Sequence, residues 1–319
     1  MSSLWRPSAS LATLRARAAL FAAVRKFFDE RGVLEVDTPI LSQAGTVDPN
    51  VESLGNAQLG WLHTSPEFPM KRLLAAGSGA IYQLVHVFRV DEVGRHHQPE
   101  FTMLEWYRPG FGYQRLMDEV AALLQAIGAP RGRYERLSYA EAFRRYTGID
   151  AFQEPAEAIR EHLIEAGVEL ASAPSVADTA NRDFWLDLAM ATRVSPQLGL
   201  ETPCFVYDYP ATQAALSRIR ADVPPVAERF ELFWKGIELA NGFHELADAE
   251  EQGRRFTADC ATRATRGQPC PAVDKKLLAA LTHGLPECSG VALGVDRVLM
   301  LLLGLPTLAE AQSFDSTRA

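Results

Sequence analysis

The sequence predicts an α+β fold in which a mainly antiparallel sheet is flanked by helices. Three observations support this class. Apolar residues recur at helical spacing over residues 11–31. Two strand-like runs, 81–90 and 99–108, flank a short polar loop and form a predicted hairpin. Near the end of the chain, a strand over 287–293 runs directly into an apolar helix over 295–303.

Boundary residues place the elements of the first half of the chain. Gly32 is a candidate C′ residue for the first helix, and Pro39 ends the strand that follows it. Pro66 is compatible with the first turn of a helix. The predicted elements are a helix over 11–31, strands over 33–36 and 61–64, a helix over 65–76, the hairpin strands and a helix over 113–127.

The second half begins with an alanine-rich helical pattern over about 138–195, for which Ser138 and Asp178 are candidate N-caps. We interpret it as a helical insertion within a single domain that spans residues 1–319. No internal repeat or evident linker divides the chain. The elements predicted after the insertion are strands over 204–207 and 229–234, helices over about 249–266 and 273–283, and the final strand and helix.

Composition excludes several classes of protein. The 319 residues are 47% hydrophobic and 23% charged, which is typical of a globular chain with a large core. A formal net charge of −8 gives no support for nonspecific nucleic-acid binding, which depends on lysine and arginine neutralising phosphates. No apolar run approaches the ~20 residues that cross a bilayer, so we expect no membrane association.

Four cysteines, none in a C-x-x-C pair, indicate neither a zinc site nor a disulfide framework. We therefore expect reduced thiols in a cytoplasmic protein. The first 28 residues lack Asp and Glu and contain several arginines, a composition also found in transit peptides. We assign them to the first helix instead, because this helix leads directly into the strand at 33–36.

The predicted hairpin carries the most informative polar residues. Arg89 and Asp91 lie two apart, as do Glu105 and Tyr107, so each pair shares one face of its strand. Phe101 adds a flat apolar face on the return strand. An arginine, carboxylates and an aromatic ring on one patch suit a nucleoside triphosphate beside a small cation. The alternative is an ordinary hairpin with a solvated polar face.

Four ordered segments of the chain resemble the class II aminoacyl-tRNA synthetases, in their lysyl form. RVDEVGRHHQPEFTMLEWY (89–107) resembles motif 2, GVLEVDTP (32–39) motif 1, and GVALGVDRVLML (290–301) motif 3. KGIELANGFHEL (235–246) is similar to the metal-binding strand of the family. The resemblance implies the class II antiparallel sheet. Because barely ten residues precede the first helix, we expect no anticodon-binding domain.

The resemblance implies ATP and Mg²⁺ as cofactors and two catalytic arginines. Arg89 corresponds to the arginine that bridges the substrate carboxylate and the α-phosphate, a role that suits a guanidinium fork. Arg297 corresponds to the arginine that holds the far phosphates, and Gly294 lets nucleotide approach the start of a helix. The alternative for Arg297 is a surface salt bridge. The other expected ATP-binding residues are Asp91, His97, Gln98, Phe101, Glu238 and Leu239.

For Mg²⁺, the resemblance points to Glu238 and Glu245, whose hard oxygen atoms suit a cation bound to a triphosphate. Asp91 stands where the family has a longer Glu that contacts adenine. A zinc site at His244 has little support, because no cysteine or second histidine lies at metal-ligand spacing.

Carboxylates define the expected substrate. Ser65 and Glu67 correspond to the family segment that holds the substrate amino group, and Glu105 and Tyr107 to residues around the distal ammonium. Acidic groups that converge on a pocket need positive partners, so they predict a dicationic, lysine-like substrate. Glu245 and Ala292 complete the expected substrate-binding set. Ala292 replaces a family glycine, which favours a lysine isomer with a moved amino group.

Within the family, the chain is similar to the synthetase paralogues that make (R)-β-lysyl-adenylate and pass its β-lysyl group to a lysine ε-amine of elongation factor P, with AMP as the leaving group. We therefore expect (R)-β-lysine as substrate, elongation factor P as partner and tRNA as an unlikely acceptor. Motif 1, with Pro39, implies a homodimer. Two alternatives are a minimal lysyl-tRNA synthetase and a catalytically silent lysine sensor. Retention of the arginines and of Glu238 and Glu245 argues against the silent form.

Overall fold

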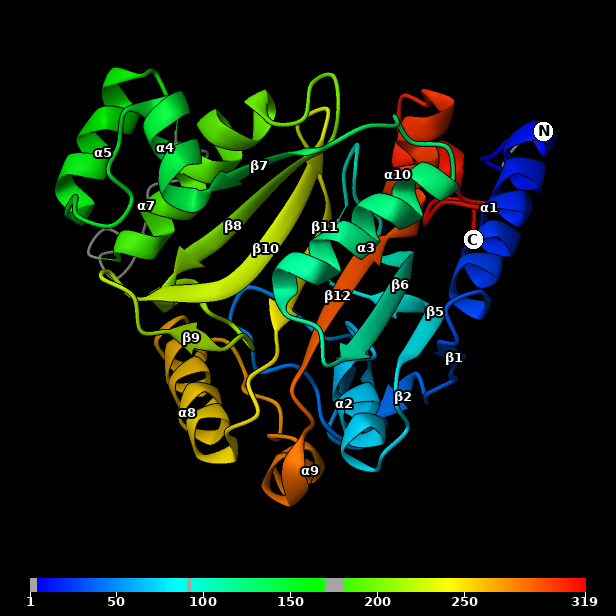
Figure 1. Ribbon diagram of the computed structural model, residues 1–319, viewed down its shortest axis with the longest axis horizontal. Helices are drawn as coiled ribbons and strands as arrows, with labels where there is room; N and C mark the ends of the chain where they lie inside the picture. The colour runs from blue at the N-terminus through cyan, green and yellow to red at the C-terminus, as the bar shows by residue number, and fades with distance from the viewer. Residues whose placement is uncertain (1–4, 91–92, 170–180) are drawn as a thin grey trace. The chain divides into compact units, whose positions relative to one another are not determined.

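A computed structural model of the protein describes residues 5–90, 93–169 and 181–319. The chain divides into two compact units, with residues 1–129 and 245–319 in unit 1 and residues 130–244 in unit 2 (Figure 1). The expectation of a single domain over 1–319 therefore stays a prediction. Within the described ranges, no helix is both long and apolar enough to cross a membrane.

Unit 1 contains a sheet with the strand order β1-β5-β6-β12 and a separate small sheet with the order β2-β4-β3. β1 pairs with β5 in parallel, and the other pairings are antiparallel. Its elements are α1 (Leu11–Asp29), β1 (Leu34–Glu35), β2 (Leu41–Ser42), β3 (Gly55–Asn56), β4 (Gly60–Leu62), α2 (Glu67–Ala75), β5 (Ile81–Phe88), β6 (Glu100–Pro109), α3 (Tyr113–Ala126), α8 (Ala249–Thr265), α9 (Lys275–Gly284), β12 (Cys288–Gly294), α10 (Val295–Leu303) and the 3₁₀ turn η5 (Leu308–Ala311).

One face of the β5-β6-β12 sheet forms the core of unit 1. Trp106 of β6 is fully buried, and its ring centroid lies 5.4 Å from that of Phe28 in α1. Phe28 also stacks on Tyr82 of β5 with centroids 4.4 Å apart. The Trp106 indole N–H donates to Glu119 of α3 at 3.1 Å. Helices α1 and α3 therefore cover this face (Figure 1).

The strand register defines the opposite face of the same sheet. Glu105 pairs with both Gln83 and Ala292, and Tyr107 pairs with both Ile81 and Gly290. Directly paired residues in an antiparallel ladder share a face, and side chains alternate along each strand. Glu105 and Tyr107 therefore share the face opposite Trp106, as the sequence predicts.

Unit 2 contains strands in the order β11-β10-β8-β7, with β9 paired to β10. Helices α4, α5 and α7 share a buried core with β8 and β10, built around Phe143, Trp185 and Val206. Its elements are β7 (Glu135–Ser138), α4 (Tyr139–Thr147), α5 (Ala156–Glu165), α7 (Arg182–Ala189), the π turn η2 (Met190–Val194), the 3₁₀ turns η3 (Ser195–Gln197) and η4 (Ala211–Gln213), β8 (Cys204–Pro210), β9 (Ile219–Arg220), β10 (Val226–Trp234) and β11 (Ile237–His244).

The predicted helices and strands are confirmed, with their ends displaced by only a few residues. Gly32 has φ +62° after α1, which is the left-handed conformation expected of a C′ glycine. Ser138 caps α4 in a capping box with Glu141. The second predicted cap, Asp178, lies outside the described residues, and Asn181 caps α7.

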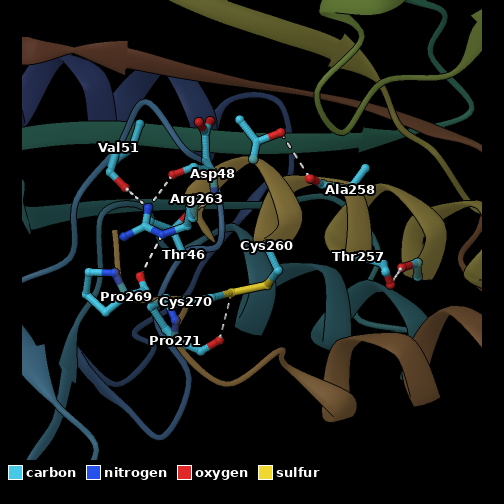
Figure 2. The surroundings of a disulfide bond; sticks show 12 residues. Thr46, Asp48, Val51, Thr257, Ala258, Cys260, Arg263, Pro269, Cys270 and Pro271 are labelled. Atoms are coloured by element: carbon cyan, nitrogen blue, oxygen red, sulfur yellow. Dashed lines mark hydrogen bonds between the residues drawn. A yellow bond between two sulfur atoms is a disulfide. The ribbon is translucent and has the colours of Figure 1, made fainter. Parts of the chain in front are cut away.

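The prediction that the cysteines are all reduced is wrong. Cys260 in α8 and Cys270 in the following loop form a disulfide, with their Cα atoms 5.5 Å apart (Figure 2). The chain turns back at the end of α8 and brings together two cysteines ten residues apart, a spacing that a search for C-x-x-C pairs does not detect. Cys204 and Cys288 are free and buried.

A buried arginine beside this disulfide holds the loop over residues 48–52 (Figure 2). The Arg263 side chain is 0% exposed and is paired with the Glu52 carboxylate. Its guanidinium donates to the backbone carbonyls of Asp48 at 2.7 Å and Val51 at 3.3 Å. The Glu52 carbonyl in turn accepts from the N–H of Val90 at 3.1 Å. Arg263 therefore supports the backbone immediately after Arg89.

Candidate active site

Three glutamates and one lysine form a buried charged cluster in unit 1. Glu67 and Lys71 lie one turn apart on α2, and Glu245 precedes α8. The Lys71 ammonium lies 2.7 Å from Glu67 Oε1 and 2.6 Å from Glu245 Oε2. The third glutamate, Glu105, comes from the middle of β6 and is 2% exposed. Residues from α2, β6 and the segment before α8 thus converge beside one face of the sheet.

Two hydroxyl groups hold the Glu105 carboxylate. Ser65 Oγ donates to Oε2 at 2.7 Å, and the Tyr107 hydroxyl donates to Oε1 at 2.6 Å. Ser65 Oγ also accepts from the backbone N–H of Glu67 at 3.0 Å. One side chain therefore both provides a hydrogen-bond acceptor for a free N–H at the start of α2 and orients Glu105. The Ser-Pro-Glu segment therefore couples the N-terminus of α2 to β6.

The cluster requires a glycine at position 290. Gly290 lies opposite Tyr107 in the β6–β12 ladder. A Cβ atom there would lie 2.3 Å from Tyr107 Cε1 and 2.6 Å from Glu245 Oε1. The Gly290 backbone also hydrogen-bonds the Glu245 carboxylate. The absent side chain lets Tyr107 and Glu245 approach the β12 backbone.

Burial perturbs the ionisation of the cluster. It raises the pKa of Glu105 to about 8, the negative charge of Glu67 adds to this effect, and the hydrogen bonds from Tyr107 and Ser65 oppose it. Burial also raises the pKa of Glu245 to about 7, against the attraction of Lys71. For Lys71, burial lowers the pKa, but the charges of Glu245 and Glu67 outweigh it and the pKa is raised. Glu67 and Glu245 thus share one resident cation, while Glu105 is held by two hydroxyl groups.

The two arginines predicted to be catalytic, Arg89 and Arg297, also belong to unit 1. Arg89 follows β5, and its guanidinium lies 5.2 Å from the centroid of the Phe101 ring, with Nε donating to the carbonyl of Thr64 at 3.4 Å. Arg297 is in the first turn of α10, and its Nε donates to the His96 carbonyl at 3.2 Å. The backbone of the hairpin loop is thereby tied to the start of α10.

Comparison with known proteins identifies the family. The model of the tRNA synthetases class II (D, K and N) matches residues 2–318. This chain belongs to the class II tRNA synthetases. A curated relative from Yersinia enterocolitica (serotype O:8 / biotype 1B, strain NCTC 13174 / 8081), elongation factor P–(R)-beta-lysine ligase, is 50% identical over 325 residues. The alignment covers 99% of this chain and 98% of the relative.

Membership in the class II tRNA synthetases confirms the predicted fold class. The structure brings most of the expected substrate-binding residues together. Glu67, Glu105 and Glu245 belong to the charged cluster, and Ser65 and Tyr107 donate hydrogen bonds to it. Their roles toward a ligand stay predictions.

Ala292, the remaining substrate-binding residue of the prediction, lies directly opposite Glu105 in the sheet. It packs with Phe101 against a small apolar cluster on the same face. The members of that cluster are Val85, Val87 and Met103.

The other predicted ATP-binding residues are spread over the two units. Gly294 ends β12 and is the N-cap residue of α10. The side-chain oxygen of Gln98, which is buried, accepts from the N–H of Ser316 at 3.2 Å. His97 is bridged to Gly94 within the loop. Asp91 lies outside the described residues. Glu238 and Leu239 lie on β11 in unit 2, so their place in this class II site stays a prediction.

Sequence reasoning missed Lys71 and Gly290. The signal for Lys71 was its position four residues after Glu67 on a predicted helix, which is the spacing of an i,i+4 ion pair. Because Arg72 follows directly, the two basic residues are easily taken for a solvated face. For Gly290, the close approach of Tyr107 depends on the pairing of two strands nearly 200 residues apart, which no local pattern indicates.

The charged cluster also bears on the predicted metal site. No group of three or more His, Cys, Asp or Glu side chains suited to a metal occurs among the described residues. Mg²⁺ bound with substrate phosphates commonly uses only one or two carboxylates, so Glu238 fits such a role. The Glu245 carboxylate is paired with Lys71 and its side chain is 1% exposed. Its predicted role as a Mg²⁺ ligand stays a prediction.

Proposed function

We propose that this protein activates (R)-β-lysine with ATP and transfers the β-lysyl group to a lysine ε-amine of elongation factor P. Two findings support this proposal. The relative with that named activity shares half of its residues with this chain over nearly the full length of both. The second finding, which carries the substrate assignment, is the charge of the buried cluster.

The cluster matches a substrate with two ammonium groups. The cluster contains three carboxyl groups and one cation. Lys71 pairs with Glu67 and Glu245, and Glu105 lies near enough to Glu67 and Glu245 for their negative charges to raise its pKa. With all four groups ionised, two negative charges remain uncompensated. Buried carboxylates are costly unless cations pair with them, so a ligand with two ammonium groups stabilises the cluster. Lysine and its β-isomer have two such groups, whereas aspartate and asparagine have one.

The proposed reaction has two steps. In the first, a carboxylate oxygen of the amino acid attacks the α-phosphorus of ATP, and pyrophosphate leaves. In the second, the neutral acceptor amine attacks the carbonyl carbon of the adenylate, AMP leaves and the amine loses a proton. Both steps depend on alignment of the reactants and on stabilisation of charge at phosphorus.

Arg89 and Arg297 are the proposed sources of that charge stabilisation. Arg89 would hold the substrate carboxylate and the α-phosphate together, with its guanidinium kept over Phe101. Arg297 would hold the distal phosphates from the start of α10, where backbone N–H groups also favour anions. Mg²⁺ held in part by Glu238 would neutralise further charge on the triphosphate.

We propose a homodimer that forms through the motif 1 region. Phe27 and Phe28 of α1 are buried within one chain and are not available to a partner. In contrast, Leu34 and Leu41 are each 56% exposed and Ile40 is 39% exposed, on either side of Pro39. A second chain would cover these apolar residues. Sedimentation at micromolar concentration should give twice the monomer mass of 35.1 kDa, and a monomer would contradict the dimer.

Label transfer tests the proposed acceptor. Because the proposed acceptor is a translation factor, the proposal places the reaction in the cytoplasm. Purified enzyme, ATP and labelled (R)-β-lysine would be incubated with elongation factor P or with total tRNA. The proposal expects label on the factor. Label on tRNA with an unlabelled factor would instead support a minimal lysyl-tRNA synthetase.

ATP–pyrophosphate exchange tests the activation step separately. Arg297→Ala should lower exchange on the order of 10²–10³-fold, the usual effect of removing one preorganised donor to a transition state. Exchange within a few-fold of the parent enzyme would refute the role of Arg297. No exchange in the parent enzyme with any lysine-type amino acid would refute the proposed function.

A further inference from the structure

Lys71 is a charged residue that the proposed reaction does not use. Its side chain is 1% exposed, and its ammonium lies between two carboxylates, 2.7 Å from Glu67 and 2.6 Å from Glu245. It lies on α2 between the buried residues Met70 and Leu74. Packing in the core of unit 1 does not by itself require a cation at this position, and burial of an ammonium is costly unless carboxylates pair with it, as Glu67 and Glu245 do here.

The contacts of Lys71 divide the cluster into two parts. Glu67 from α2 and Glu245 from the segment before α8 are joined through the Lys71 ammonium. Glu105 is held differently, by the hydroxyl groups of Ser65 and Tyr107. Two carboxylates are therefore fixed relative to each other by a cation, and a third is fixed by neutral donors.

We propose that Lys71 is a positioning and specificity-determining residue, whose ammonium holds Glu67 and Glu245 at a fixed separation and sets the number of cationic groups that the pocket accepts. The identity of the ligand rests on the proposed function. The three carboxylates of the cluster can pair with three cationic charges, and Lys71 supplies one of them. The ligand supplies the other two, so the pocket selects diammonium compounds over monoammonium ones.

Removal of the cation should disrupt this selection. Without Lys71, the carboxylates of Glu67 and Glu245 repel each other and lose the group that holds their oxygen atoms. Breaking a buried pair by removing one partner has a large effect, so affinity for lysine-type ligands should fall on the order of 10²-fold in Lys71→Met. The lost interactions contribute equally to binding in the ground state and in the transition state. KM should therefore rise while kcat changes little.

Binding and exchange assays would be made on the full-length protein and two variants. Lys71→Met removes the charge with little change in volume. Arg72→Met is the matched control, because it removes a charge from the neighbouring exposed position of the same helix. Calorimetry would compare (R)-β-lysine with (R)-3-aminohexanoic acid, which has the same chain and β-amino group but lacks the distal ammonium. ATP–pyrophosphate exchange would give KM and kcat for the same pair.

The proposal expects Lys71→Met to lose most of the preference for (R)-β-lysine over (R)-3-aminohexanoic acid, and Arg72→Met to keep it. An unchanged preference or an unchanged KM in Lys71→Met would overturn it. If the parent enzyme catalyses no exchange, the proposed function fails, yet calorimetry still tests Lys71. If the parent protein binds no diammonium ligand at all, the inference about Lys71 fails as well.

Chemical rescue distinguishes positioning from a purely structural role and covers variants that fold poorly. Lys71→Ala deletes a fragment that propylammonium restores, whereas 1-propanol has a similar size without the charge. Propylammonium, and not 1-propanol, should restore (R)-β-lysine binding and raise the melting temperature of Lys71→Ala. Rescue of folding without rescue of binding, or equal rescue by both compounds, would overturn the proposal.

Discussion

The replacement of Gly290 by alanine tests whether the charged cluster depends on close approach to β12. The new Cβ would lie 2.3 Å from Tyr107 Cε1, 2.4 Å from Tyr107 Cδ1 and 2.6 Å from Glu245 Oε1. The Tyr107 ring must therefore move by about 1 Å before its contact with the methyl becomes an ordinary van der Waals contact. Tyr107 is 2% exposed, so it has no free space to move into.

The movement of Tyr107 should have two measurable effects. Overpacking of this kind lowers the free energy of unfolding by about 1–3 kcal/mol, which urea denaturation can measure. The 2.6 Å hydrogen bond from Tyr107 to Glu105 would also be lost or lengthened. A displacement of about 1 Å in a substrate-positioning group lowers kcat/KM on the order of 10²-fold, which ATP–pyrophosphate exchange can measure.

Gly253→Ala is the matched control. Gly253 lies within α8, and a Cβ there meets nothing within 4 Å. Alanine at a helix interior stabilises by roughly 0.5–1 kcal/mol relative to glycine, so this variant should be as active as the parent enzyme and at least as stable. If Gly290→Ala behaves like Gly253→Ala in both assays, the close approach has no importance for the cluster.

Three further predictions follow from the site and its support. Affinity for (R)-β-lysine should fall as the pH drops through about 8, the raised pKa of Glu105, because the protonated carboxyl has no charge to pair with an ammonium. Calorimetry near pH 8 should detect proton release on binding, and Glu105→Gln should reduce that release, leaving the part that comes from Glu245 with its pKa of about 7. Ala292→Gly should shift the ratio of kcat/KM toward α-lysine by ~1–3 kcal/mol, and an unchanged ratio would mean that the methyl only packs in the core. Arg263→Ala should lower the free energy of unfolding by about 3–5 kcal/mol, with Arg263→Lys intermediate, whereas a loss below 1 kcal/mol would contradict its role in holding the loop over 48–52.

The elements of the fold could be predicted from the sequence because their signals are local. The apolar spacing over 11–31 and the glycine that follows it were sufficient to define α1. Ser138 likewise marked the start of α4 through a capping box. Side chains that share a strand face, such as Glu105 and Tyr107, also follow from the two-residue period.

The contacts that complete the cluster could not be predicted in this way. The Lys71–Glu245 pair joins residues 174 positions apart and depends on the packing of α2 against the segment before α8. The Cys260–Cys270 disulfide depends on how the chain turns after α8. Such contacts are set by tertiary structure, and one sequence without its relatives contains no direct record of them.

The surroundings of Lys71 also bear on self-modification. In the proposed reaction, an activated β-lysyl group is transferred to a lysine amine, and the enzyme has a lysine of its own, Lys71, in the charged cluster. An amine attacks an adenylate only in its neutral form. Glu245 and Glu67 raise the pKa of Lys71 and keep it protonated at neutral pH, against the effect of burial. The carboxylates that bind this ammonium therefore also make Lys71 a poor nucleophile toward the adenylate.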